Sequence, residues 1–323
     1  MSSPTPLHVV FGAGQVGPLL ARRLAAGGHA VRLVRRGAHT GDLTGIEPVR
    51  ADATDPAAVA EAVRSASVVY HCMNPSTYSA GVWARELPPL QENLVAAAGR
   101  AGARLVVLDN LYSIGRTGGR PMNEDSPTNP CSRKGEVRAR LREALLAAAR
   151  RGDARVAVGR ASDFHGPGGV GTYFADLFWK PALAGRKVRF FVNPDTPHTY
   201  HFIPDVAAGL AAIGLDPDAE GTFMLPCLPA VSSRAMADRF AAALGRPITL
   251  ARVPRVAMTL AELFVPLVRS VNEMAYQWEE PFVVDDARFR ARFGSLATPA
   301  AAAARATAEW AVATWGPDGR RAA

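Results

Sequence analysis

Five polar side chains of the sequence have the types needed for proton-transfer chemistry. They are Asp109, Tyr112, Lys134, Asp163 and His165. A phenol or an imidazole can give a proton to a reacting group, and a carboxylate can act as a base or orient a neighbouring phenol. A lysine ammonium can hold ribose hydroxyls and supply positive charge. We therefore expect acid–base chemistry if the fold brings these residues to one place.

The elements that must position them are short apolar runs alternating with Ala- and Leu-rich helical runs such as 17–28 and 55–66, the second of which opens with Asp55 as a cap. The apolar runs are continuous, which is typical of strands buried on both faces of a parallel sheet. They cover residues 7–11, 30–36, 47–51, 67–72, 104–110 and 155–161. This order predicts an α/β fold with a Rossmann-type doubly wound parallel sheet, whose sites lie at the carboxyl ends of the strands.

The alternation loosens after about residue 165. Further helices are predicted over 172–185, 205–215, 232–245 and 301–316, with one more strand over 221–227. We predict an NAD(P)-binding domain over 1–165 and a smaller mixed substrate lobe over 166–323, with part of 200–215 returning to the first core. The last helix is expected to pack through its tryptophans. Aromatic residues of the 172–185 helix either flank the substrate pocket or belong to the core; they are Phe174, Phe178 and Trp179.

The segment VVFGAGQVGPLLARRL predicts a dinucleotide site. Gly12, Gly14 and Gly17 follow a strand and open a helix, which suits a tight turn, close approach of a pyrophosphate and close helix–strand packing. Gln15 and Val16 lie between them, at a helix N-terminus that favours phosphate. The alternative is a tight turn without a ligand.

The second strand ends in Arg35 and Arg36 instead of an acidic residue, which favours NADP over NAD because guanidinium groups suit a 2′-phosphate. The alternative is a solvated basic turn. Asp52 is predicted to meet the adenine amino group. Further cofactor contacts are expected from residues that follow the fourth and sixth strands, namely Cys72, Met73, Asn74, Ala161 and Ser162.

Several motifs together resemble the short-chain dehydrogenase/reductase superfamily, on the side of its extended and atypical NAD(P)-dependent epimerase/dehydratase-like members. They are GAGQVG (12–17), ADATD (51–55), DNLYSIG (109–115), EDSPTNPCSRKG (124–135), GRASDFHGPG (159–168), HFIPDVAAGL (201–210) and VVDDARFRARFG (283–294). The resemblance covers nearly the whole chain and names no substrate.

The resemblance implies a tyrosine four residues before a lysine, and a serine near the end of the fifth strand. Lys134 stands at the lysine position, where the resemblance implies a hold on the nicotinamide ribose. Pro130 stands at the tyrosine spacing, and the serine position falls near Leu108 or Asp109. Proline has no acidic group, so the usual proton donor is missing. The alternative for Lys134 is a surface lysine that opens a helix.

Tyr112 is the first candidate to replace the tyrosine, because it follows the fifth strand and a cation nearby would lower the pKa of a phenol. The alternative is a non-catalytic tyrosine that the family often has at this turn. Asp109 is a second candidate, as a base or as an orienter of Tyr112, or it caps a turn with Asn110.

Substrate contacts are predicted from Asp163, His165 and Tyr200, the last within PHTYHF (197–202). The alternatives are a solvated loop and a polar strand edge. The spacing of histidines, cysteines and carboxylates gives no regular metal-ligand pattern, so no metal is predicted.

The net charge of +8 does not indicate a nucleic-acid partner. Only three of the 37 basic residues are lysines, and the arginines are scattered without a block that alternates with aromatics. Three widely spaced cysteines predict a reduced, cytoplasmic setting. No apolar run has membrane-spanning length and no secretory signal is recognised, so no membrane partner is expected.

Three functions stay open at this point. The first is an NAD(P)-dependent oxidoreductase or epimerase-type enzyme acting on a small carbonyl, alcohol or sugar-like substrate. The second is a non-catalytic NADP(H) sensor of the NmrA-like kind, which the missing tyrosine favours. The third is an isomerase or lyase without net redox. A homodimer is compatible with the resemblance.

Overall fold

The computed structural model describes residues 6–75, 77–253 and 266–316. The chain forms two compact units that interleave along the sequence. The sheet unit contains the residues up to Ser113, Arg133–Ala161 and Val206–Leu225. The second unit contains Ile114–Ser132, Ser162–Asp205 and the residues from Pro226 onward.

The sheet unit is built on strands that alternate with helices. Its elements are β1 (Leu7–Phe11), α1 (Gly17–Ala26), β2 (Ala30–Arg35), β3 (Ile46–Arg50), α2 (Pro56–Ala62), β4 (Ala66–His71), α3 (Ala80–Arg100), β5 (Arg104–Asp109), α4 (Arg133–Arg151), β6 (Arg155–Arg160), α6 (Ile203–Leu215) and β11 (Gly221–Met224). Among the described residues the sheet has seven strands in the order β11-β6-β5-β4-β1-β2-β3, and every neighbouring pair is parallel. The predicted doubly wound Rossmann-type fold is confirmed.

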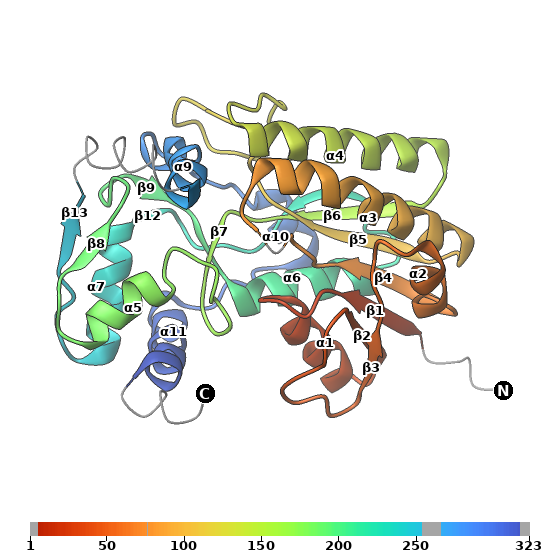
Figure 1. The fold of residues 1–323 in the computed structure, drawn as a ribbon, viewed down its shortest axis with the longest axis horizontal. Helices are drawn as coiled ribbons and strands as arrows, with labels where there is room; N and C mark the ends of the chain where they lie inside the picture. The colour runs from red at the N-terminus through yellow and green to blue at the C-terminus, as the bar shows by residue number, and fades with distance from the viewer. Residues whose placement is uncertain (1–5, 76, 254–265, 317–323) are drawn as a thin grey trace. The chain divides into compact units, whose positions relative to one another are not determined.

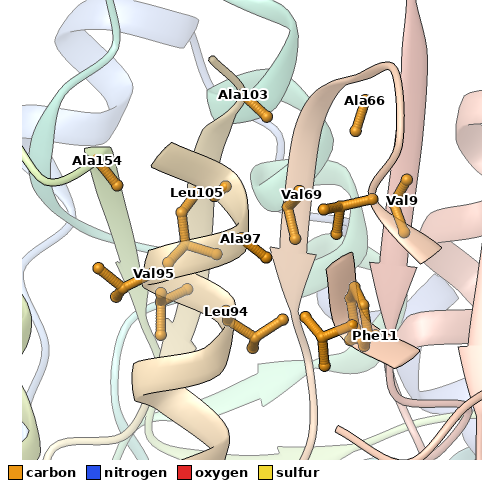
Figure 2. Packing of buried hydrophobic residues seen from close by; sticks show 14 of the residues in the cluster. Val9, Phe11, Ala66, Val69, Leu94, Val95, Ala97, Ala103, Leu105 and Ala154 are labelled. Carbon is orange, nitrogen blue, oxygen red and sulfur yellow. The ribbon is translucent and has the colours of Figure 1, made fainter. Parts of the chain in front are cut away.

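Helices cover both faces of this sheet (Figure 1). α2, α3 and α4 lie on one face, and α1 and α6 lie on the other. The first face holds the main apolar core, in which Leu94, Val95 and Ala97 of α3 pack over the strands (Figure 2). Strand residues such as Val69 and Leu105 are fully buried there, as their continuous apolar runs require.

Local sequence signals favour helix α2 but oppose helix α3. α2 begins as predicted, because the Asp55 side chain accepts hydrogen bonds from the N–H groups of Ala57 and Ala58. α3 carries Pro88 and Pro89 in its interior, where proline removes backbone donors and usually breaks a helix. Its buried face, which includes Trp83 and Leu94, packs in spite of this.

The strand order reverses between β1 and β4, and this is the point where doubly wound sheets bind their ligands. Gly12 follows β1 and Cys72 follows β4. The Cys72 N–H donates to the carbonyl of Phe11 at 2.8 Å, so the ends of the two strands stay joined.

The second unit has short strands and a helical core. Its strand pairs are β7 (Asp163–His165) with β10 (Tyr200–Phe202), β9 (Pro197–His198) with β12 (Val231–Ser232), and β8 (Val188–Phe190) with β13 (Leu250–Arg252). Its helices are α5 (Asp176–Leu183), α7 (Ser233–Leu244), α9 (Pro266–Asn272), the 3-10 helix η1 (Ala275–Trp278), α10 (Ala287–Phe293) and α11 (Ala300–Trp315).

The core of the second unit settles two expectations. The aromatic side chains of the 172–185 region, which include Phe174, Phe178 and Trp179, are core residues at 1% exposure or less. α11 buries alanines such as Ala304 and Ala308, whereas its tryptophans are only partly buried against the same cluster. The prediction of packing through tryptophans therefore holds only in part, because small side chains permit closer helix contact.

No helix within the described residues is long and apolar enough to cross a membrane.

Candidate functional site

The glycine motif has the geometry of a phosphate-binding turn. Gly12 has φ +107°, and a Cβ there would lie 2.8 Å from the Cys72 backbone. A Cβ on Gly17 would lie 1.8 Å from the Gly12 carbonyl oxygen, so helix and turn touch there. Gly14 differs, because a Cβ on it would meet no atom within 4 Å. The turn is thus closed at its base and open at Gly14, where a pyrophosphate could approach.

The polar groups at the start of α1 are available to a ligand. Val16 is the N-cap residue and makes no side-chain capping bond. The Gln15 Oε1 atom is buried and has no hydrogen-bond partner among the described residues. A helix N-terminus without a capping side chain attracts anions through its N–H groups and dipole. These features fit a dinucleotide phosphate.

The predicted adenosine end lies after β2 and β3. Arg35 is partly exposed and Arg36 is exposed. Asp52 accepts hydrogen bonds from the Thr54 N–H at 2.9 Å and the Thr54 hydroxyl at 2.8 Å. These bonds, with a smaller effect of the Arg36 charge, hold the pKa of Asp52 below its ordinary value. The carboxylate is therefore ionised and can accept a bond from an adenine amino group.

The residues after β4 are tied to one another. Burial raises the pKa of the Cys72 thiol to about 12, so the thiol stays neutral. Burial, with a smaller effect of the Arg138 charge, lowers the pKa of His71 to about 3. The Met73 N–H donates to His71 Nδ1 at 3.2 Å, and the side-chain oxygen Oδ1 of Asn74 accepts from Arg138 at 2.7 Å. This segment thus carries a neutral thiol and an ordered side-chain amide.

Two phenols and a buried lysine meet at the start of α4. The Tyr78 hydroxyl is hydrogen-bonded to the Tyr112 hydroxyl at 3.0 Å. The Lys134 Nζ lies 4.4 Å from the centre of the Tyr78 ring, in a cation–π arrangement. Lys134 has 0% exposure, which excludes the alternative of a surface lysine. Tyr112 also stacks on Trp83, with ring planes 2° apart. We call Tyr78, Tyr112 and Lys134 the phenol–lysine cluster.

Asp109 lies in a buried ion network. Arg138 lies 3.6 Å from one of its carboxylate oxygens and Arg160 lies 3.5 Å from the other. Arg138 also lies 4.8 Å from the centre of the Trp83 ring, so Lys134 and Arg138, one helical turn apart, face adjacent aromatic rings. The single negative charge of Asp109 thus lies between two guanidinium groups, and its role as a base or as the orienter of Tyr112 stays a prediction.

The turn after β5 also explains the position of Tyr112. The Tyr112 N–H donates to the Asn110 side chain at 3.1 Å, so Asn110 caps the turn with its own side chain. Arg160 donates to the Asn110 carbonyl oxygen at 2.8 Å and to the Ser113 hydroxyl at 2.7 Å. The phenol of Tyr112 is thus held on a rigid support.

Sequence reasoning missed Tyr78, Trp83 and Arg138. Tyr78 lies between β4 and α3, where nothing in the spacing marks a functional residue. Arg138 lies four residues after Lys134, so the helical period could have placed both cations on one face of α4. Trp83 lies in α3 before Pro88 and Pro89, and these prolines hide the helical pattern that would have marked its buried face.

The predicted contacts after β6 are divided between the two units. The Ala161 N–H donates to the Asp109 carbonyl at 3.0 Å, and this bond extends the sheet. Ser162 belongs to the second unit, where its N–H donates to His201 Nδ1 at 3.1 Å and its hydroxyl lies 3.2 Å from His198 Nε2. The Asp163 carboxylate lies 2.9 Å from the same nitrogen of His198.

His165 and Tyr200 lie in the interior of the second unit. Burial, aided by the charges of His201 and Arg239, lowers the pKa of His165 to about 3, and its Nδ1 is hydrogen-bonded to Thr307 at 3.1 Å. Burial raises the pKa of Tyr200, whose hydroxyl contacts Ser233 at 2.6 Å. Both side chains serve the core, so we do not include them in the proposed site.

No group of three or more histidine, cysteine or acidic side chains that could hold a metal ion occurs within the described ranges.

Known proteins share both the sequence pattern and the fold. A family model described as the NAD dependent epimerase/dehydratase family matches residues 8–223. Among curated proteins no relative matches the chain.

Three solved structures are similar over nearly the whole chain. UDP-N-acetylglucosamine 4-epimerase from Bacillus cereus has a TM-score of 0.76 at 14% identity, covering 94% of this chain and 96% of that one. The Bordetella bronchiseptica enzyme WbmH in complex with NAD+ has a TM-score of 0.75 at 17% identity, covering 96% of this chain and 99% of that one. DesIV, a dTDP-glucose 4,6-dehydratase from Streptomyces venezuelae with NAD and TYD bound, has a TM-score of 0.74 at 17% identity, covering 94% of this chain and 96% of that one. Identities this low establish a shared fold.

The family match rests on more than the glycine turn, since it includes 216 of the 323 residues and ends within β11 of the sheet. The chain therefore belongs to the NAD dependent epimerase/dehydratase family.

Proposed function

We propose that the protein is an NAD(P)-dependent oxidoreductase of the epimerase/dehydratase type, acting on a small carbonyl, alcohol or sugar-like substrate. The observation that carries this proposal is the phenol–lysine cluster. A hydrogen-bonded pair of phenols beside a buried ammonium is an arrangement for proton transfer, and it lies in the sheet unit, on the segments that follow β4 and β5.

The sheet unit supplies the cofactor contacts in this proposal. The turn at Gly12, Gly14 and Gly17 and the N-terminus of α1 would hold the pyrophosphate, while Asp52 would accept from the adenine. The bound nicotinamide would supply hydride transfer. We propose that the sheet unit binds the nucleotide and that the second unit binds the substrate. The division into a nucleotide-binding domain over 1–165 and a substrate lobe over 166–323 stays a prediction.

We propose NADP as the preferred cofactor. The support is the charge of Arg35 and Arg36 at the end of β2, where an acidic residue would instead bind the ribose hydroxyls. Exposure of Arg36 leaves its guanidinium free to meet a 2′-phosphate.

Tyr112 is the proposed proton donor and acceptor toward the substrate, and Tyr78 is its partner. A proton leaving Tyr112 can be replaced from Tyr78 along the 3.0 Å hydroxyl contact, while the Lys134 charge stabilises the phenolate form of the neighbouring Tyr78. Lys134 is also proposed to hold the nicotinamide ribose, as the resemblance implies. The cluster thus replaces the acid that Pro130 cannot supply.

The test is a titration of the purified protein with NADPH and NADH, followed by turnover assays on a panel of aldehydes, ketones and keto-sugars. Wild type is compared with Tyr112→Phe, Tyr78→Phe and the control Tyr70→Phe, a phenol of the same unit whose hydroxyl contacts His8 instead. We expect Tyr112→Phe to lower kcat by about 10²- to 10⁴-fold with NADPH binding unchanged. Normal turnover in Tyr112→Phe would refute the proposed acid.

Pro130 at the tyrosine spacing favours a second candidate, a non-catalytic NADP(H) sensor. Tight nucleotide binding with no turnover across the panel would establish that function and exclude the oxidoreductase. A cytoplasmic location and a homodimer stay predictions.

A further inference from the structure

A buried tryptophan contacts both phenols of the phenol–lysine cluster. Trp83, in the first turn of α3, is 1% exposed. Its ring meets the Tyr78 ring edge-on, with centres 5.5 Å apart and planes at 82°. It stacks on the Tyr112 ring, with centres 6.1 Å apart and planes at 2°. Tyr78 and Tyr112 are 34 residues apart in the sequence, so Trp83 is a common support for two rings that come from separate segments.

The indole N–H of Trp83 anchors the segment that carries Tyr78. Trp83 Nε1 donates to the carbonyl oxygen of Thr77 at 3.0 Å, and the backbone N–H of Ser79 donates to the same oxygen at 2.9 Å. Ser79 is the N-cap residue of α3 and makes no side-chain capping bond. The indole bond therefore joins the residue just before Tyr78 to the first turn of α3.

Helix α4 holds the indole in turn. The Arg138 guanidinium lies 4.8 Å from the centre of the Trp83 ring, in a cation–π arrangement. Arg138 is only 8% exposed, donates to Asn74 at 2.7 Å and lies 3.6 Å from Asp109, so its own position is fixed. The same helix carries Lys134. The two phenols and the ammonium of the phenol–lysine cluster thus share one support.

The hydroxyl contact between the phenols tolerates little displacement. Its oxygen–oxygen distance of 3.0 Å lies at the upper end of the usual range for a hydrogen bond between hydroxyls. A further separation of about half an ångström would break the bond. A proton that Tyr112 gives to a substrate could then no longer be replaced from Tyr78. The support of the two rings therefore decides whether they act as a pair.

We propose that Trp83 is a positioning residue, which holds Tyr78 and Tyr112 at hydrogen-bond distance and exchanges no proton itself. The kinetic consequence rests on the proposed function, whereas the arrangement of the rings does not. A misplacement of about 1 Å costs about a hundredfold in rate, so loss of this support should appear in kcat. The proposed pyrophosphate contacts do not involve Trp83, so nucleotide affinity should be kept.

The distance between the rings is tested by proton NMR of deuterated protein with protonated tyrosines, without any ligand. Wild type should show a nuclear Overhauser effect between the ring protons of Tyr78 and Tyr112, assigned by its loss in Tyr112→Phe. Trp83→Phe removes the N–H that holds Thr77 and should weaken the effect, and Trp83→Leu should abolish it. The matched control Trp179→Phe changes a fully buried tryptophan of the second unit and should leave the effect unchanged. No effect in wild type, or an undiminished effect in Trp83→Phe, would overturn the proposal.

Kinetic measurements test whether this arrangement serves the reaction. We expect kcat to fall about tenfold in Trp83→Phe and about a hundredfold in Trp83→Leu, with KM and the Kd for NADPH changed less than about twofold. Trp179→Phe should keep its kcat, and urea unfolding records the stability of each variant. The phenylalanine variants decide the outcome where the leucine variant does not fold, and equal kcat values in Trp83→Phe and Trp179→Phe would overturn the proposal. If wild type turns over no substrate, the proposed function fails, and the NMR experiment decides the positioning role by itself.

Discussion

Replacing Gly14 with alanine separates cofactor binding from folding. The backbone at Gly14 does not have a left-handed φ, and no atom lies within 4 Å of where the new methyl group would be. Alanine therefore fits the folded chain without strain. Because alanine has fewer unfolded conformations than glycine, we expect the free energy of unfolding to stay the same or rise by about 0.4–1 kcal/mol.

Nucleotide binding should respond in the opposite direction. The open space at Gly14 is where the pyrophosphate would approach the N–H groups at the start of α1. A methyl group there holds the phosphates away from those donors. Each hydrogen bond to a charged group is worth about 1.5–3 kcal/mol, so losing two raises the Kd for NADPH at least about a hundredfold.

The assay is NADPH fluorescence titration paired with urea unfolding, on three variants. Gly81→Ala is the matched control, since Gly81 is an exposed helix residue whose added Cβ would lie no closer than 3.9 Å to another atom. It should keep full NADPH affinity. Gly17→Ala should instead destabilise the fold, because its Cβ would lie 1.8 Å from the Gly12 carbonyl oxygen. Unchanged NADPH affinity in a stable Gly14→Ala variant would refute the assignment of this turn to the pyrophosphate.

Nucleotide preference, the phenol pair and a core histidine each give another test. Arg36→Ala should weaken NADPH binding about fivefold and spare NADH in parallel titrations, because an exposed guanidinium contact is worth about 1 kcal/mol; equal losses would exclude a 2′-phosphate contact. The double variant Tyr78→Phe/Tyr112→Phe should lose less kcat/KM than the two single variants predict together, by about 1 kcal/mol, because one hydroxyl contact joins the two phenols. Strictly additive losses would show that the phenols act separately. His165 has a pKa of about 3 in the fold against an ordinary 6.5, so the unfolded chain binds the extra proton as the pH falls. The free energy of unfolding therefore falls as the pH drops from about 6.5 toward about 3, by up to about 5 kcal/mol. In urea unfolding, the stability of His165→Gln should depend less on pH than that of wild type. Parallel curves of unfolding free energy against pH for the two proteins would contradict this account.

The sheet was predictable because its strands are buried on both faces and therefore read as uninterrupted apolar runs. LHVVF and RLVVLD have this form, and both are internal strands of the sheet. The glycine turn was predictable for a related reason, since close backbone approach at Gly12 and Gly17 tolerates no other residue. Steric requirements of this kind restrict the residue type directly, so they can be recognised in the sequence.

The phenol–lysine cluster was only half predictable. Lys134 and Tyr112 lie at positions that strand ends and helix starts identify, whereas Tyr78 is distant in sequence and meets them only through the packing of α3 against α4. The same limit applies to His198, whose partner Asp163 lies on a different strand pair. Contacts between residues far apart in one sequence leave no spacing to recognise.

The interleaving of the two units has a consequence for how this architecture can acquire new chemistry. Each segment of the second unit leaves the sheet just after the carboxyl end of one of three adjacent strands: 114–132 after β5, 162–205 after β6, and the chain from 226 after β11. Residues in such excursions can be inserted, deleted or exchanged without disturbing the hydrogen bonds between the strands of the sheet. Pro130 lies in the first excursion, while Lys134 lies beyond its return. Pro130 and Lys134 therefore belong to parts of the chain that can change separately, although they are only four residues apart.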